Sequence, residues 1–130
     1  MATAAPSQNL PLFYNAIEPL SATQHGKMKV RGILRMPQVA RTHAIPVTVD
    51  EFTLAQRHYP IVFAVGENPV PIALMGLNEG INVFLDEDGR ALDQGIYIPA
   101  YIRRYPFLLA RLRPISAIGT AFSPTAKTIG

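Results

Sequence analysis

The sequence predicts an α+β fold that is built on an antiparallel β-meander, and three observations support this prediction. Apolar runs at 61–65, 70–77 and 81–85 have the length of β-strands. The connectors that follow these runs are rich in turn residues and are too short to join parallel strands. Twelve prolines and nine glycines in 130 residues favour short elements that are joined by tight turns.

Two further strands are predicted before the meander. Residues 27–34 partly alternate polar and apolar side chains, which is typical of a strand with one face in water. Residues 45–48 form another short apolar run. The stretch 36–44 between them has no clear period, so we expect a loop there.

A short helix is predicted at 49–58. Thr48 and Glu51 have the spacing of a capping box, in which each residue satisfies a backbone amide of the other. Pro60 ends the helix, because proline disfavours a helical conformation in the residue before it. One face of the helix is apolar, because three apolar residues recur at helical spacing. These residues are Phe52, Ala55 and Tyr59.

A second short helix is predicted at 99–104. Pro99 suits the first turn of a helix, where its missing N–H costs nothing. Pro106 would cost about 3 kcal/mol inside a helix, so the helix ends near Arg104. Residues 107–112 then form a strand or another short helix, and we prefer the strand.

The chain has few charges, and they are unevenly placed. Charged residues make up 16% of the sequence and the net charge is +3. Residues 67–93 hold six acids and one base, whereas residues 99–113 hold four arginines and no acid. Either the two segments lie close together and neutralise each other, or the arginines form a surface for an anion or a partner.

The sequence contains no constellation that is typical of an enzyme. The absence of cysteine excludes disulfides, thiolate metal sites and thiol nucleophiles. Residues 86–89 begin like a calcium loop, but Arg90 and Tyr97 stand where ligand oxygens are needed, so we expect a turn. The histidines are scattered without metal-ligand spacing. These are His25, His43 and His58. We therefore expect no enzymatic activity, no metal and no cofactor.

No segment of the sequence reads as a signal peptide or as a membrane span. The first 20 residues lack a basic start and a continuous apolar run. The longest apolar run, 70–77, is far shorter than the roughly 20 residues that cross a bilayer. We expect a soluble chain that is cytoplasmic by default.

Residues 97–107 combine three tyrosines, two arginines and two prolines. Arginines beside tyrosines can bind phosphate or carboxylate and can stack on the rings. The competing interpretation is that the aromatic residues anchor this segment to the sheet. Single-stranded nucleic acid would be opposed by the acidic segment. The candidate residues for binding a ligand or a partner are Tyr101, Arg103, Arg104 and Tyr105.

Several stretches resemble the SapC family of bacterial proteins. They are 46–52 leading into 59–63, then 82–89, then 98–107, in the order and at about the spacing of that family. The resemblance covers about residues 25–110 and implies a role at the surface layer or envelope. Here Ala91 follows Arg90, where the family tends to place an aromatic residue.

The resemblance also shapes the expected domain organisation. We expect an extended arm at 1–24, a SapC-like α+β domain at 25–112 and a tail at 113–130 that departs from the family pattern and is a candidate for disorder. Family members are longer and contain two similar halves, so the resemblance implies that this domain is incomplete. The resemblance is to the N-terminal half of the family only, so a truncated or frame-shifted product, or a fragment, with exposed apolar edge surface is expected.

The sequence thus leads to two hypotheses about function. The first is a non-enzymatic binding or assembly module, related to surface-layer or envelope proteins, that binds a protein partner or associates with itself. The alternative is an enzyme or its accessory subunit that holds a small anionic ligand with the tyrosine- and arginine-rich segment. We expect neither nucleic-acid binding nor a membrane span.

Overall fold

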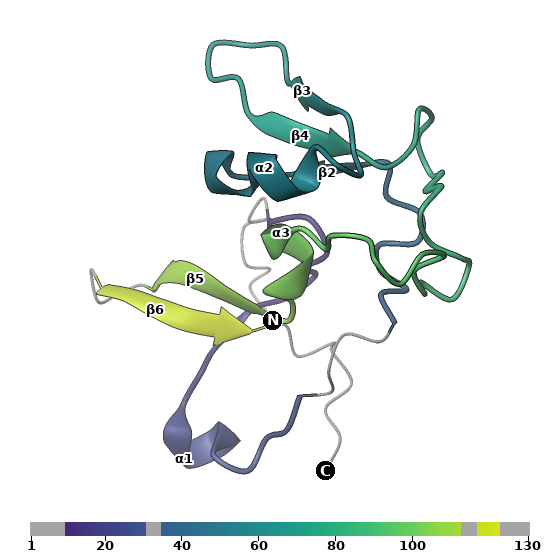
Figure 1. Cartoon of the computed structure of the whole chain (residues 1–130). Coiled ribbons are helices and arrows are strands. Elements are labelled where there is room, and N and C mark those ends of the chain that lie inside the picture. Colours follow the sequence, from purple (N-terminus) through teal and green to yellow (C-terminus); the bar gives the residue numbers. More distant parts are fainter. Residues whose placement is uncertain (1–9, 31–34, 113–116, 123–130) are drawn as a thin grey trace, which may run out of the picture. The chain divides into compact units, whose positions relative to one another are not determined.

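The computed structural model describes residues 10–30, 35–112 and 117–122, and these fall into two compact units (Figure 1). The central unit is Gly32–Arg104, and the terminal unit combines Met1–Arg31 with Tyr105–Gly130. Each unit contains one three-stranded antiparallel sheet, and short helices accompany the sheets. The predicted α+β class is therefore confirmed.

The sheet of the terminal unit has the strand order β1-β6-β5. β1 is Glu18–Pro19, β5 is Phe107–Leu112 and β6 is Ala117–Phe122. β5 and β6 are paired over their whole length. The preference for a strand at 107–112 is confirmed, and part of the segment that was expected to be a tail forms its partner.

The N-terminal residues of the terminal unit pack on this sheet. Tyr14 is buried with Leu108 and Ala121. The Tyr14 hydroxyl donates a 2.8 Å hydrogen bond to the carbonyl of Phe107, and its ring lies 5.5 Å from that of Tyr105. The described part of the expected extended arm is thus fixed to the sheet, and it includes β1 and the start of helix α1 (Ala22–His25).

The sheet of the central unit has the strand order β2-β4-β3. β2 is Ala44–Pro46, β3 is Ile61–Phe63 and β4 is Pro71–Leu74. β3 and β4 form the antiparallel hairpin that was predicted from the runs at 61–65 and 70–77, although both strands are shorter. The strand that was predicted at 45–48 becomes β2, which pairs with the other side of β4.

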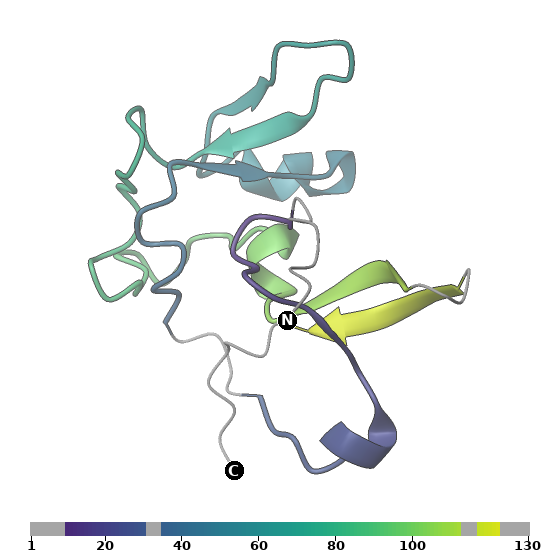
Figure 2. The same ribbon diagram turned by 180° about the vertical axis from the view of Figure 1, so that it is seen from behind.

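The helix that was predicted at 49–58 is formed as a 3₁₀ turn, η1 (Val49–Glu51), followed by α2 (Phe52–Ala55). It lies on one face of the central sheet, in front of β2 in Figure 1 and behind it in Figure 2. Ala55 is fully buried together with Ile45 of β2 and Ala73 of β4. The predicted apolar side of the helix therefore contributes to the core.

The prediction of a strand at 81–85 was wrong. This segment makes only one isolated bridge, between Leu85 and Ala91. The reason is the side chain of Asn82, which is buried and donates to the carbonyls of Val39 and Thr42 at 3.2 and 3.1 Å. Hydrogen bonds to a side chain replace the ladder that a third strand of the meander would have made.

The prediction of a strand at 27–34 was also wrong for its described part. No named strand forms at 27–30, because the chain turns after α1, where the Met28 amide donates to the carbonyl of His25; of these four residues, Lys29 makes a β-bridge. Residues 31–34 lie outside the described residues. The helix that was predicted at 99–104 is confirmed as α3 (Ala100–Arg103).

The acidic turn at 86–89 is formed as predicted. The Gly89 amide donates to the carbonyl of Asp86 at 3.0 Å, and the Arg90 amide donates to the Asp86 carboxylate at 2.8 Å. Gly89 has a φ of 75°, and a Cβ there would lie 2.2 Å from the carbonyl carbon of Met36. Both the left-handed conformation and the close approach require glycine.

Candidate functional site

The capping box that was predicted from Thr48 and Glu51 is formed. One carboxylate oxygen of Glu51, Oε2, accepts from the Thr48 amide at 2.9 Å and from its hydroxyl at 3.0 Å. The Glu51 side chain is only 6% exposed. This local motif therefore places a charged carboxylate inside the central unit.

The second oxygen of the same carboxylate reaches the segment that leads into α3. Oε1 of Glu51 accepts from the Tyr97 hydroxyl at 2.8 Å and from the Ala100 amide at 2.6 Å. The backbone of this segment is also held at Tyr97, whose carbonyl accepts a 2.7 Å hydrogen bond from the buried Tyr59. Glu51 thus joins the beginnings of two helices that are distant in the sequence.

These contacts set the ionisation of both side chains. Burial raises the pKa of Glu51, but the hydrogen bonds from Ala100, Thr48 and Tyr97 lower it by more, so the pKa lies below its ordinary value of 4.5. Burial and the adjacent carboxylate raise the pKa of the Tyr97 phenol. The pair is therefore an ionised carboxylate beside a neutral phenol, which is a stable arrangement and a poor proton donor.

The arginines of the predicted site contact tyrosines of their own segment. The Arg103 guanidinium donates to the Tyr97 hydroxyl at 3.1 Å and lies 5.5 Å from the centre of that ring. The Arg104 guanidinium lies 4.1 Å from the centre of the Tyr101 ring. Three of the four predicted site residues are thus placed near one another in the central unit, and both guanidinium groups lie within cation–π distance of a tyrosine ring.

Tyr105, the fourth predicted site residue, belongs to the terminal unit. Its ring packs against Tyr14. The segment is therefore anchored at both of its ends, through Tyr97 at one end and through Tyr105 at the other. Binding of a ligand or a partner by Tyr101, Arg103 and Arg104 stays a prediction, as does their neutralisation by the acidic turns.

A different feature of the central unit is the face of its sheet that lies opposite α2, which we call the open sheet face. Phe63 contacts Phe52 of α2, with ring centres 6.2 Å apart, so the alternate residue Val62 lies on the opposite side. The strand registers place only apolar residues on that side, and none of them is buried. These residues are Ala44, Pro46, Val62, Ile72 and Leu74.

One edge of the same sheet has unpaired backbone groups. The Ala64 amide donates to Val70 and the Leu74 amide to Pro60, so the even-numbered residues of β3 face β4. The N–H and C=O groups of Ile61 and Phe63 therefore point away from the sheet. Within the described residues, no hydrogen bond reaches them. We call this edge of β3 the open edge.

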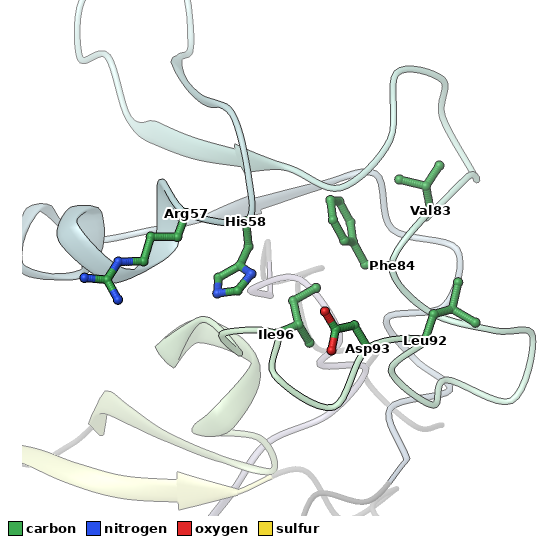
Figure 3. Close-up of a pocket in the computed structure, with 7 residues that line it drawn as sticks. All are labelled: Arg57, His58, Val83, Phe84, Leu92, Asp93 and Ile96. Atoms are coloured by element: carbon green, nitrogen blue, oxygen red, sulfur yellow. The ribbon is translucent and has the colours of Figure 1, made fainter.

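The central unit also contains a pocket of about 350 Å³ (Figure 3). Figure 3 shows His58 and the Asp93 carboxylate near Ile96, with Arg57 directed away from them. Asp93 already accepts a 2.9 Å hydrogen bond from the Gly95 amide, which holds its own turn. The pocket is lined by Arg57, His58, Val83, Phe84, Leu92, Asp93 and Ile96.

Across residues 10–30, 35–112 and 117–122, no three histidine or acidic side chains gather in a way that could hold a metal ion. In the same part of the chain, no helix has the length and apolar content that crossing a bilayer requires.

The fold and these features define an α+β protein with a sheet that is apolar on both faces and a buried carboxylate whose hydrogen bonds are made within the central unit. Comparison with protein-family models shows that the SapC model matches residues 20–122. The chain therefore belongs to the SapC family, as its motifs suggested. Comparison with curated proteins and with solved structures found no match.

Sequence reasoning missed two features of this unit. It treated Glu51 only as half of a capping box, because Tyr97 lies 46 residues further along the chain and no local pattern indicates their contact. It also did not identify the open sheet face. A signal for that face was available, because every residue of β2, β3 and β4 is apolar, whereas a sheet with one wet face alternates polar and apolar residues.

Proposed function

We propose that this SapC-family chain is a non-enzymatic binding and assembly module that acts at the surface layer or envelope. It binds a protein partner through the open sheet face and the adjoining β3–β4 hairpin. The observation that carries the proposal is the apolar character of this sheet on both sides. An antiparallel sheet that left one face in water would carry polar side chains there.

The exposed side chains of the hairpin support the same proposal. Val62 is 39% exposed, Phe63 58%, Val65 105% and Val70 46%. Single exposed apolar residues are common, but contiguous ones mark interaction sites. These four lie on one hairpin with no charged residue between them except Glu67 at its tip.

Partner capture from a native lysate tests this function. A variant with Val62→Lys and Val70→Lys should lose the bound partners that the wild type retains, because two charges on the apolar surface oppose its burial. Leu77→Lys is the matched control, since Leu77 is 91% exposed but lies beyond the other end of β4. Identical partners for both variants, with folding intact by circular dichroism, would remove the hairpin from the proposal.

A second candidate function is the binding of a small anion by Arg103 and Arg104. One observation favours it: the guanidinium of Arg104 is stacked on Tyr101, which holds its planar donors in a fixed orientation. A thermal-shift screen with phosphate, citrate and other anionic metabolites tests this candidate. Stabilisation that is lost in Arg104→Ala would support it, and an unchanged melting temperature with every anion would contradict it.

A further inference from the structure

We propose that the partner of the open edge is a second copy of this chain, and this inference rests on the proposed binding function. The β3 strands of two copies pair antiparallel about a twofold axis at Val62. Ile61 of one copy then lies opposite the partner's Phe63. The two three-stranded sheets become one continuous six-stranded sheet, with β3 at its centre.

The backbone groups of β3 are self-complementary in this register. Each copy offers the N–H and C=O of Ile61 and Phe63, and the antiparallel pairing of Ile61 with the partner's Phe63 is a hydrogen-bonded pair. The pairing therefore satisfies all the outward backbone groups of β3 on both copies. Val62 keeps its own hydrogen bonds to β4 and lies opposite itself as a non-hydrogen-bonded pair.

The side chains of β3 also fit a second copy. Non-hydrogen-bonded pairs have their α-carbons only about 4.5 Å apart, so the two Val62 side chains would contact each other. They lie on the open sheet face, which pairing extends across both copies. No residue from 61 to 66 is charged, so self-pairing brings no like charges together along the strand.

The charges that flank β3 favour the antiparallel orientation. The chain before β3 carries the exposed base Arg57, and the loop after β3 carries the exposed acid Glu67. Antiparallel pairing brings the basic flank of each copy towards the acidic flank of the other. A parallel arrangement would place like charges together.

A single cysteine at the axis tests this pairing directly, because the natural chain contains no cysteine. Val62→Cys should form a disulfide-linked dimer under mild oxidation, since the expected α-carbon separation suits a disulfide. Leu77→Cys is the control, and its thiol is the more exposed of the two: Leu77 is 91% exposed and Val62 only 39%. We expect Val62→Cys to cross-link roughly tenfold faster than Leu77→Cys, because the pairing holds its two thiols together. Equal rates, or faster linking of Leu77→Cys, would overturn the proposal.

A second measurement separates backbone pairing from apolar contact. Phe63→Ala and Phe63→Pro both remove the ring, but only proline also removes the outward N–H, which makes no bond to β4. Two hydrogen bonds are lost per dimer, so analytical ultracentrifugation should show dimerisation of Phe63→Pro weakened roughly thirtyfold relative to Phe63→Ala. Equal dissociation constants for two folded variants would contradict edge pairing.

The outcomes also distinguish this inference from the proposed function. A wild type that stays monomeric at high concentration, but whose captured partners are lost in the Val62→Lys and Val70→Lys variant, would overturn self-pairing and support the binding function. A monomer whose captured partners are unchanged in that variant would contradict both.

Discussion

The Tyr97 hydroxyl donates a 2.8 Å hydrogen bond to the Glu51 carboxylate, which lies 46 residues earlier in the chain. The same carboxylate closes the capping box at Thr48 and accepts from the Ala100 amide at the start of α3. The Glu51 side chain therefore caps its own helix and also holds the distant segment that leads into α3. Its removal should affect the stability of the central unit more than the loss of a cap alone.

Replacement of Glu51 by glutamine should destabilise the chain by about 2–3 kcal/mol. The amide keeps the shape of the side chain, but it loses the charge and replaces one acceptor oxygen with an NH2 donor, which then faces the donors that this oxygen had satisfied. Urea unfolding followed by circular dichroism measures the change. The neighbouring exposed acid provides the control, and Asp50→Asn should change stability by less than about 0.5 kcal/mol. Equal effects of the two substitutions would show that the cluster contributes little.

Stability should also fall in acid because of Glu51. Its pKa in the folded state lies below the ordinary value of 4.5, so its contribution is fully present above pH 4.5 and is lost as the pH falls through the folded pKa. Urea midpoints from pH 7 down to pH 3 measure this loss. The difference between wild type and Glu51→Gln should shrink over the acidic part of that range. A constant difference would mean that the carboxylate does not titrate as its contacts require.

Tyr97→Phe removes the hydroxyl that links Glu51 with Arg103 and should cost about 1–2 kcal/mol. Arg103→Ala should cost less than about 1 kcal/mol, because its contact with the Tyr97 ring is exposed to water. A double-mutant cycle of Tyr97→Phe with Glu51→Gln should reveal a coupling energy of about 1 kcal/mol. Strictly additive losses would indicate that the two side chains do not depend on each other.

Asn82→Ala should destabilise the chain by about 2–3 kcal/mol, since it removes a donor to two backbone carbonyls and the acceptor of a backbone amide. Those carbonyls belong to Val39 and Thr42, and the Asn82 side chain also accepts from the Phe84 amide at 2.9 Å. The exposed Asn68 gives a matched control, for which the Asn68→Ala change should be small. If both variants unfold at the same urea concentration, the side chain of Asn82 does not hold this segment in place.

Much of the local structure could be predicted from the sequence. The capping box at Thr48, the hairpin between β3 and β4, the acidic turn that ends at Gly89 and the short α3 are all present. The main signal for each of these comes from residues that lie within about a dozen positions of one another. Proline, glycine and capping residues act on the backbone at their own position. The turns and helix ends that they specify can therefore be predicted without knowledge of the rest of the fold.

The site was less predictable than the fold. The tyrosine- and arginine-rich segment was identified, but the contacts of Arg103 and Arg104 are with tyrosines of that same segment. The open edge at Ile61 and Phe63 exists because β4 pairs with β2 on its other side. No pattern within β3 itself indicates which of its two edges pairs with β4 and which stays unpaired. A β3 strand that paired through its other edge would need the same apolar residues.

The sequence by itself determined the α+β class, the positions of the turns and the membership of the SapC family. Only the tertiary structure decided that β2, and not the segment 81–85, is the second neighbour of β4. The physical reason is that more than one apolar run could pair with the second edge of β4. The buried side-chain amide of Asn82 holds segment 81–85 outside the sheet through its hydrogen bonds. Its partners lie about 40 residues away in the chain, where local propensity has no influence.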